Sequence, residues 1–164
     1  MLRHHGDLVL STSVPPIVEF DTDLLESVSA AMCEVMYANQ GVGLAANQIG
    51  LALRLFVYDI GTGCRTIVNP EILESHGETV DVEGCLSVPG LGCEIVRAEY
   101  VKLSAVDISG VPEIVEATGF EARVFQHETD HLNGLLLLDR LDPDTREMAE
   151  RFLAQRVGAE GGDE

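Results

Sequence analysis

The sequence is poor in positive charge. It contains 10 Lys and Arg residues against 28 Asp and Glu residues, and its formal net charge is −18 at pH 7. Nucleic acids and anionic membranes are bound through clustered cations, and this chain has a single lysine, Lys102. The composition therefore argues against both partners, and we expect a solvated anionic surface.

Long apolar runs and paired cysteine motifs are also missing. No stretch approaches the roughly 20 apolar residues that a membrane span needs, and the first residues contain too short an apolar segment for a signal peptide. The four cysteines include no Cys-x-x-Cys pair of the zinc-ribbon type. We therefore expect a cytoplasmic protein without disulfides, in which each cysteine is a small buried hydrophobe.

The length and the apolar pattern indicate one globular domain. The chain has 164 residues, of which 46% are hydrophobic, enough to form a core without staples. We expect a single catalytic domain over residues 1–157 and an acidic disordered tail over 158–164. Helix, strand run, helix, helix is an α+β pattern, and the short spacings between strands favour antiparallel pairing. The predicted helices cover 22–39, 120–133 and 142–157, the last with Met148, Phe152 and Leu153 facing inward; the predicted strands cover 51–59, 66–69, 78–82, 94–107 and 112–118.

The strongest local signal is the segment from His127 to His131, which reads His-Glu-Thr-Asp-His. Residues i and i+4 of a helix lie on one face, so both imidazoles can point at one metal ion while Glu128 reaches its open side. Phe120 and Val124 continue the same stripe, so we expect the imidazoles to face the core. Asp130 either contacts an imidazole N–H or nearby backbone, or is a solvated helix charge.

A catalytic site of this kind takes three protein ligands, and the sequence offers several candidates for the third. Leu137 occupies the position where metzincin proteases place a histidine, so that family is excluded. Cys85, in the string Glu-Gly-Cys-Leu-Ser, is the preferred candidate because a thiolate is a strong ligand for zinc or iron(II). The rivals are Cys93 and, in a thermolysin-like arrangement, a downstream carboxylate from Asp139, Asp142, Glu147 or Glu150.

Three strings together resemble the signature motifs of the peptide deformylases. They are GVGLAANQ at 41–48, EGCLS at 83–87 and QHETDHLNG at 126–134, in that order and at about the family's separations. The resemblance covers residues 7–139. It implies an α+β fold with antiparallel β-sheets packed around a central helix that carries the His-Glu-x-x-His motif, with an N-terminal and a C-terminal helix.

The resemblance also implies roles for individual residues. Cys85, His127 and His131 match the metal ligands, Glu128 matches the catalytic acid/base, and Gln48 with the backbone N–H of Leu86 matches the oxyanion donors. The backbone of Gly43 matches a peptide-binding group, and the positions near the methionine side-chain pocket are Val42, Phe120 and Val124.

The implied reaction is the removal of the N-formyl group from the N-terminal formylmethionine of nascent proteins. The implied cofactor is one divalent ion, Fe²⁺ in the first place, with Zn²⁺, Ni²⁺ or Co²⁺ as substitutes. The enzyme could work close to the ribosome, but the sequence offers no basic C-terminal docking helix. The alternatives are a general metalloprotease and a non-catalytic, metal-stabilised binding domain.

Overall fold

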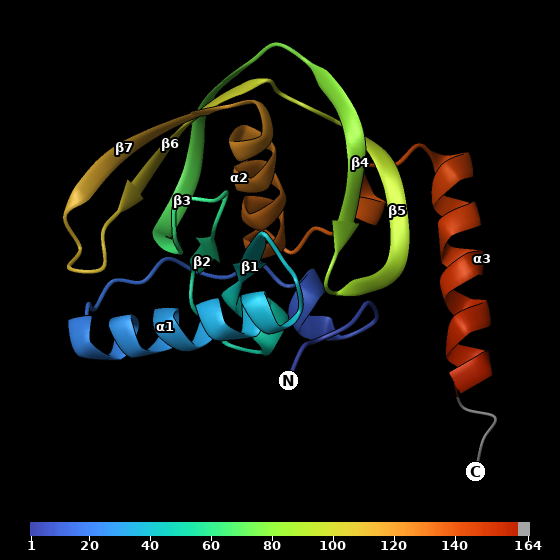
Figure 1. Ribbon diagram of the computed structural model, residues 1–164, viewed down its shortest axis with the longest axis horizontal. Coiled ribbons are helices and arrows are strands. Elements are labelled where there is room, and N and C mark those ends of the chain that lie inside the picture. The colour runs from blue at the N-terminus through green and yellow to red at the C-terminus, as the bar shows by residue number, and fades with distance from the viewer. Residues whose placement is uncertain (161–164) are drawn as a thin grey trace.

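A computed structural model describes residues 1–160, with side chains for residues 1–156. Helix α2 stands between a five-stranded antiparallel sheet of order β1-β2-β3-β6-β7 and a two-stranded ribbon of β4 and β5 (Figure 1). The α+β prediction with antiparallel pairing is therefore confirmed. The helices are α1 (Thr22–Ala38), α2 (Gly119–Leu132) and α3 (Pro143–Glu160), and the strands are β1 (Gly43–Ala45), β2 (Leu55–Tyr58), β3 (Arg65–His76), β4 (Thr79–Cys85), β5 (Val88–Arg97), β6 (Tyr100–Val106) and β7 (Pro112–Thr118).

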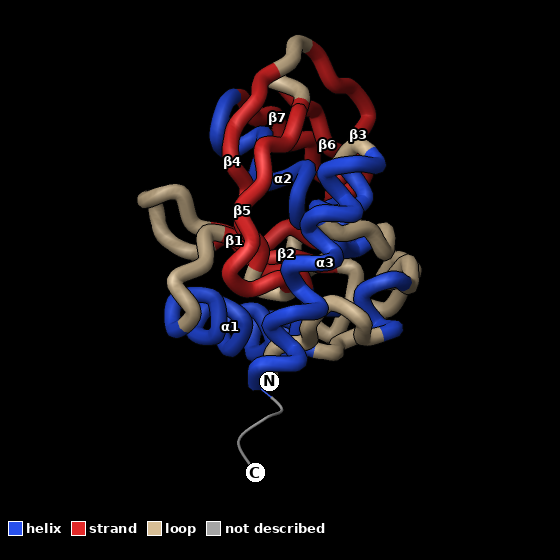
Figure 2. Tube along the Cα trace, turned by 90° about the vertical axis from the view of Figure 1, so that its right-hand side faces the viewer, coloured by secondary structure: helices blue, strands red, loops and turns tan. Residues whose placement is uncertain are grey.

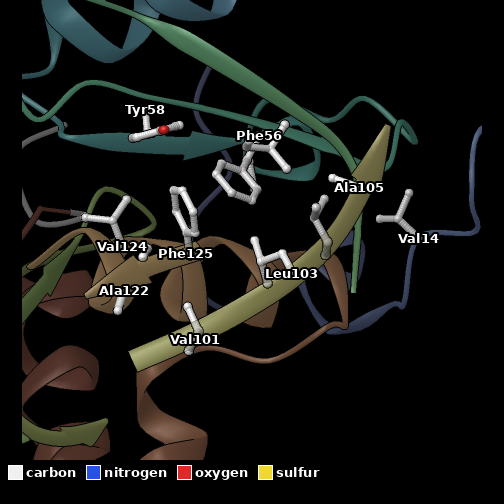
Figure 3. Close-up of a cluster of buried hydrophobic side chains, with 13 residues drawn as sticks. Val14, Phe56, Tyr58, Val101, Leu103, Ala105, Ala122, Val124 and Phe125 are labelled. Atoms are coloured by element: carbon white, nitrogen blue, oxygen red, sulfur yellow. The ribbon is translucent and has the colours of Figure 1, made fainter. Parts of the chain in front are cut away.

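Helix α2 is positioned by an aromatic core. Phe125 lies with its ring centroid 5.7 Å from that of Phe56 and 4.9 Å from that of Tyr58, both on β2. Figure 3 shows these rings packed together with Leu103 of β6 at the contact between helix and sheet. Full burial of a side chain of this size contributes on the order of 2–3 kcal/mol. This packing fixes the orientation of the helix that carries His127 and His131.

Helix α1 packs against β1 and β2, at one edge of the five-stranded sheet. The Asp21 side chain accepts a hydrogen bond from the N–H of Leu24 and caps the first turn. Leu25, Met32 and Met36 form its buried face against β1 and β2. The predicted helix at 22–39 is confirmed within one residue.

The strand predictions were wrong in several respects. Strand β1 was not predicted, and β3 continues to His76, whereas the predicted strand ended at residue 69. The segment predicted as one strand at 94–107 is two strands, β5 and β6, which belong to different sheets. They are separated by Ala98 and Glu99, and the chain changes direction there without the Gly or Pro that normally marks such a break. The side-chain amide of Gln126 on α2 provides the hydrogen-bond partners of the backbone at this break. It accepts the N–H of Ala98 and donates to its C=O.

Helix α3 differs from its prediction in both its face and its end. Ala149 and Leu153 pack into a cluster with β5, whereas Met148 is 71% exposed and Phe152 is 40% exposed. The predicted inward face was therefore wrong for two of its three residues. The helix also continues over 158–160, which the sequence assigned to a disordered tail, and 161–164 lie outside the described residues. Within residues 1–160, no helix combines the length and apolarity required to span a bilayer.

A disulfide joins Cys33 of α1 to Cys64, which precedes β3. The prediction that the chain carries no disulfide was therefore wrong. The two residues are 31 positions apart in a sequence whose spacing gives no sign of the pair. Helix packing against the β2–β3 connection brings them together, which cysteine counting cannot detect. Cys85 and Cys93 are free.

Candidate metal centre and substrate cleft

Three predicted ligands converge at the end of β4 and on one face of α2. The Cys85 sulfur lies 3.3 Å from Nε2 of His131, which in turn lies 3.1 Å from Nε2 of His127. The two histidines are one helical turn apart, as the i, i+4 spacing requires. Phe125, packed against β2, and the β4–β5 ribbon fix the two elements that meet here.

The donor set fits one metal ion. The donor atoms of Cys85, His127 and His131 all lie within 4.8 Å of one another, and they form the one such group within residues 1–160. A sulfur and two imidazole nitrogens are ligands that suit zinc and iron(II). Three protein donors leave room for a further, non-protein ligand, which is the arrangement of catalytic sites.

The rival ligands are engaged elsewhere. Asp139 pairs with Arg146 at 2.9 Å, and Glu150 pairs with the same arginine at 2.8 Å. Asp142 accepts backbone N–H groups at the start of α3. Glu147 pairs with Arg151, and Cys93 is not part of the three-donor group. The geometry therefore favours Cys85 over every alternative that the sequence left open.

The carboxylate of Glu83 bonds the ring nitrogen of His127 that points away from the three-donor group. Its Oε2 lies 2.8 Å from Nδ1 of His127, so the other ring nitrogen faces the metal-binding group. Arg97 bonds both carboxylate oxygens, at 2.8 and 3.0 Å, and Arg123 bonds Oε1 at 2.9 Å. Burial by itself raises the pKa of Glu83, but the bonds from His127 and Arg97 outweigh it and bring the pKa to about 2. Glu83 is therefore an ionised acceptor that orients the ring of His127.

The sequence did not single out Glu83, although a signal was present. Glu83 opens the same Glu-Gly-Cys-Leu-Ser string as Cys85, and both residues belong to β4, which approaches α2. The residue predicted from the sequence as a candidate contact to an imidazole was Asp130. Asp130 is buried and accepts hydrogen bonds from Arg97, at 2.6 Å, and from Arg140. Neither alternative prediction was correct, because the carboxylate is buried and its hydrogen bonds go to two arginines, not to an imidazole or to nearby backbone.

Glu128 lies beside the ligands in an enclosed position. Its side chain is buried, and Oε2 has no hydrogen-bond partner among the described residues. Burial raises the pKa of Glu128 to about 7, and the positive charge of His127 opposes this shift. A Cβ atom at Gly43 would collide with this carboxylate, so the close approach of β1 depends on glycine.

Gln48 places its amide next to the ligand group. Its Oε1 accepts the N–H of Ala45 at 2.8 Å, which orients Nε2 toward Cys85, 3.8 Å from the sulfur. Nε2 also donates to the hydroxyl of Ser87 at 3.1 Å. These bonds hold the amide beside Cys85 and Ser87.

The ligand group opens into a cleft of about 810 Å³. Gly43 of β1 and Leu86, between β4 and β5, lie on its walls together with Gln48 and Glu128. The predicted pocket residues also line it, namely Val42, Phe120 and Val124. Phe120 is 55% exposed, so the apolar stripe of α2 runs into the cleft at this end and not into the core.

Comparisons with known proteins agree with this arrangement. The family model described as Polypeptide deformylase matches residues 1–147. The chain is 46% identical over 155 residues to a peptide deformylase of Thermotoga petrophila, covering 93% of each chain, and 44% identical over 137 residues to one of Carboxydothermus hydrogenoformans, covering 84% of this chain and 90% of that protein. The crystal structure of a peptide deformylase from Legionella pneumophila superposes with a TM-score of 0.90 at 41% identity, covering 100% of this chain and 98% of the other. The structure of the peptide deformylase from Thermus thermophilus gives a TM-score of 0.89 at 38% identity, with 97% of each chain covered.

Proposed function

The chain belongs to the polypeptide deformylase family, and we propose that Cys85, His127 and His131 hold the metal ion of its reaction. The enzyme removes the N-formyl group from the formylmethionine at the start of nascent proteins. The observation that carries the proposed ligand set is the meeting of one sulfur and two nitrogens within 4.8 Å. The donor set suits zinc and iron(II) alike. Fe²⁺ is the proposed ion, with Zn²⁺, Ni²⁺ or Co²⁺ as substitutes, because the resemblance of the three motifs to peptide deformylases implies it.

Glu128 is the proposed acid and base. The bound ion supplies the Lewis acidity that makes water a nucleophile at neutral pH. Glu128 accepts the proton of the attacking water and delivers it to the departing α-amine. The buried carboxylate lines the cleft beside the three-donor group, where it can take a proton from water and pass it to the amine.

The proposed oxyanion donors are Nε2 of Gln48 and the N–H of Leu86. Both residues line the cleft on the side of Cys85. Negative charge develops on the formyl oxygen during attack, and donors that are already oriented stabilise it without reorganisation. The bond from Ala45 to Oε1 of Gln48 is what orients one of them.

The proposed peptide site combines an edge strand with an apolar wall. Strand β1 lies at the edge of the five-stranded sheet, so its outer backbone groups can pair with an extended peptide, beginning at Gly43. Val42, Phe120 and Val124 supply the apolar wall for the methionine side chain.

Because nascent formylated chains are the substrate, we place this single catalytic domain in the cytoplasm. We assign α3 no ribosome-docking role, since Arg146 and Arg151 are paired with glutamates.

The test is formate release from formyl-Met-Ala-Ser under anaerobic conditions, with metal analysis of the same sample. We expect turnover and about one ion per chain. Cys85→Ala should lose turnover and most of its metal, whereas Cys93→Ala, the matched control, should keep both. Retention of metal and turnover in Cys85→Ala would favour a metalloprotease-type ligand set, and metal without any turnover in the wild-type chain would favour a binding domain.

A further inference from the structure

The lining of the cleft has no exposed Asp or Glu among the described residues. Of the 28 Asp and Glu residues in the chain, only Glu83 and Glu128 line it among the described residues, and they are 6% and 4% exposed. The exposed ionisable side chains on its lining are His4, His5 and Arg156. The cleft rim therefore has no exposed carboxylate within the described part of a strongly acidic chain.

Arg156 reaches the rim from α3. That helix runs beside β5, as Figures 1 and 2 show, and Ala149 and Leu153 anchor it in the cluster with β5. The guanidinium of Arg156 lies so close to Gly90 of β5 that a Cβ atom there would collide with it. It also lies 5.8 Å from the ring centroid of Phe152. These contacts hold the cation over the wall of the cleft.

Arg156 has no carboxylate partner among the side chains of residues 1–156. Among the described residues, no carboxylate forms an ion pair or a hydrogen bond with it, in contrast to Arg151 on the same helix, which pairs with Glu147 at 2.6 Å. Gly90 follows Cys85 by five positions, and β5 leads away from the ligand group. Arg156 therefore lies on the wall of the cleft and outside the three-donor group, so it can contact a part of the peptide other than the reacting bond.

We propose that the rim of the cleft selects N-formylmethionyl peptides with an acidic side chain downstream of the methionine, and that Arg156 is the residue that determines this preference. The inference rests on the proposed deformylase site. A carboxylate at the rim gains attraction from Arg156 and meets no opposing carboxylate on the lining, whereas elsewhere the −18 charge of the chain repels it.

The experiment compares kcat/KM for formyl-Met-Ala-Ser-Ser-amide peptides that carry Asp or Asn at the second, third or fourth position. The C-terminal amide removes the terminal carboxylate as a source of charge. At low salt we expect the Asp peptide to be favoured about two- to fivefold at one or more positions, in line with a solvent-exposed charge pair. This preference should disappear at about 0.5 M NaCl because of screening.

Variants locate the effect. Arg156→Gln should bring the Asp/Asn ratio close to one, and Arg151→Gln, which changes the net charge equally from a site off the cleft, should keep the wild-type ratio. A wild-type ratio of one or less at every position, or an equal loss of preference in both variants, would overturn the inference. Turnover of the neutral peptide separates the two proposals, because its absence refutes the deformylase site itself, whereas its presence without an acidic preference refutes only the role of the rim.

Discussion

At the residue scale, the site depends on how buried charges are paired around two imidazoles. Glu83 fixes the ring of His127, and Arg97 links Glu83 to Asp130 on the next turn of α2. Removing one member of such a network leaves a buried charge without a partner, which costs several kcal/mol. The polar groups behind the ligands therefore hold them in position.

Replacement of Glu128 tests the proposed proton transfer. Glu128→Gln keeps the shape of the side chain, but the amide cannot accept a proton from water. We expect kcat/KM for a formyl-Met peptide to fall at least about 100-fold, while metal content stays at the wild-type level because Glu128 is outside the donor group. Turnover within about threefold of the wild type would show that another group is the base.

Acid stability tests the state of Glu83. The folded-state pKa of about 2 lies below the reference value of 4.5, so ionised Glu83 stabilises the fold above about pH 4.5, and this contribution is lost as the pH falls toward 2. For this group alone, the free energy of unfolding of the metal-free chain should fall by about 2 kcal/mol between pH 6 and pH 3. Urea unfolding at both pH values measures the total loss, and a carboxyl titration of Glu83 by NMR isolates it; a midpoint above 4.5 would contradict the assignment.

At the element scale, helices with a clear periodic pattern were predicted well, whereas contacts between elements were predicted less well. The i, i+4 spacing on α2 and the apolar face of α1 follow from single helices, so the sequence is sufficient for them. The break between β5 and β6 depends on Gln126, which is distant in sequence, and the face of α3 depends on which side β5 covers. Such features follow from tertiary packing and leave no local pattern.

The disulfide between α1 and the β2–β3 connection gives a prediction at the same scale. Closure of a loop whose ends are 31 positions apart restricts the unfolded chain. In the chain-entropy treatment this contributes about 4 kcal/mol to the free energy of unfolding. The double variant Cys33→Ser/Cys64→Ser should lose about 2–4 kcal/mol of unfolding free energy in urea, without reductant. Cys93→Ser, which removes a free thiol, is the control, and equal stability of the double variant and the wild type would contradict the pairing.

At the scale of the whole molecule, negative charge opposes compaction. The exposed ion pairs of the chain are few compared with its excess of 18 negative charges. Screening shortens the range of this repulsion from about 30 Å at 0.01 M salt to about 8 Å at 0.15 M. We expect the thermal midpoint to rise by several degrees between 0.01 and 0.5 M NaCl, as measured by calorimetry. A constant or falling midpoint would show that attractive pairs dominate the surface.

The architecture and the site differ in how far the sequence determines them. The three motifs predicted the cleft because each carries its own chemistry, and the fold brings together Cys85, His127, His131, Glu128 and Gln48 as expected. Glu83 and Arg156 required the structure. Glu83 acts through a ring whose orientation no motif states, and Arg156 belongs to a helix whose position over β5 depends on two apolar residues, Ala149 and Leu153.

X-ray absorption at the edge of the bound metal tests the ligand set most directly. The measurement should find one sulfur and two imidazole nitrogens around the ion in the wild-type chain loaded anaerobically with iron(II). In Cys85→Ala the sulfur should be absent and the metal content reduced. A wild-type spectrum without sulfur, or a sulfur signal that persists in Cys85→Ala, would contradict the convergence of Cys85 with His127 and His131 on which the account depends.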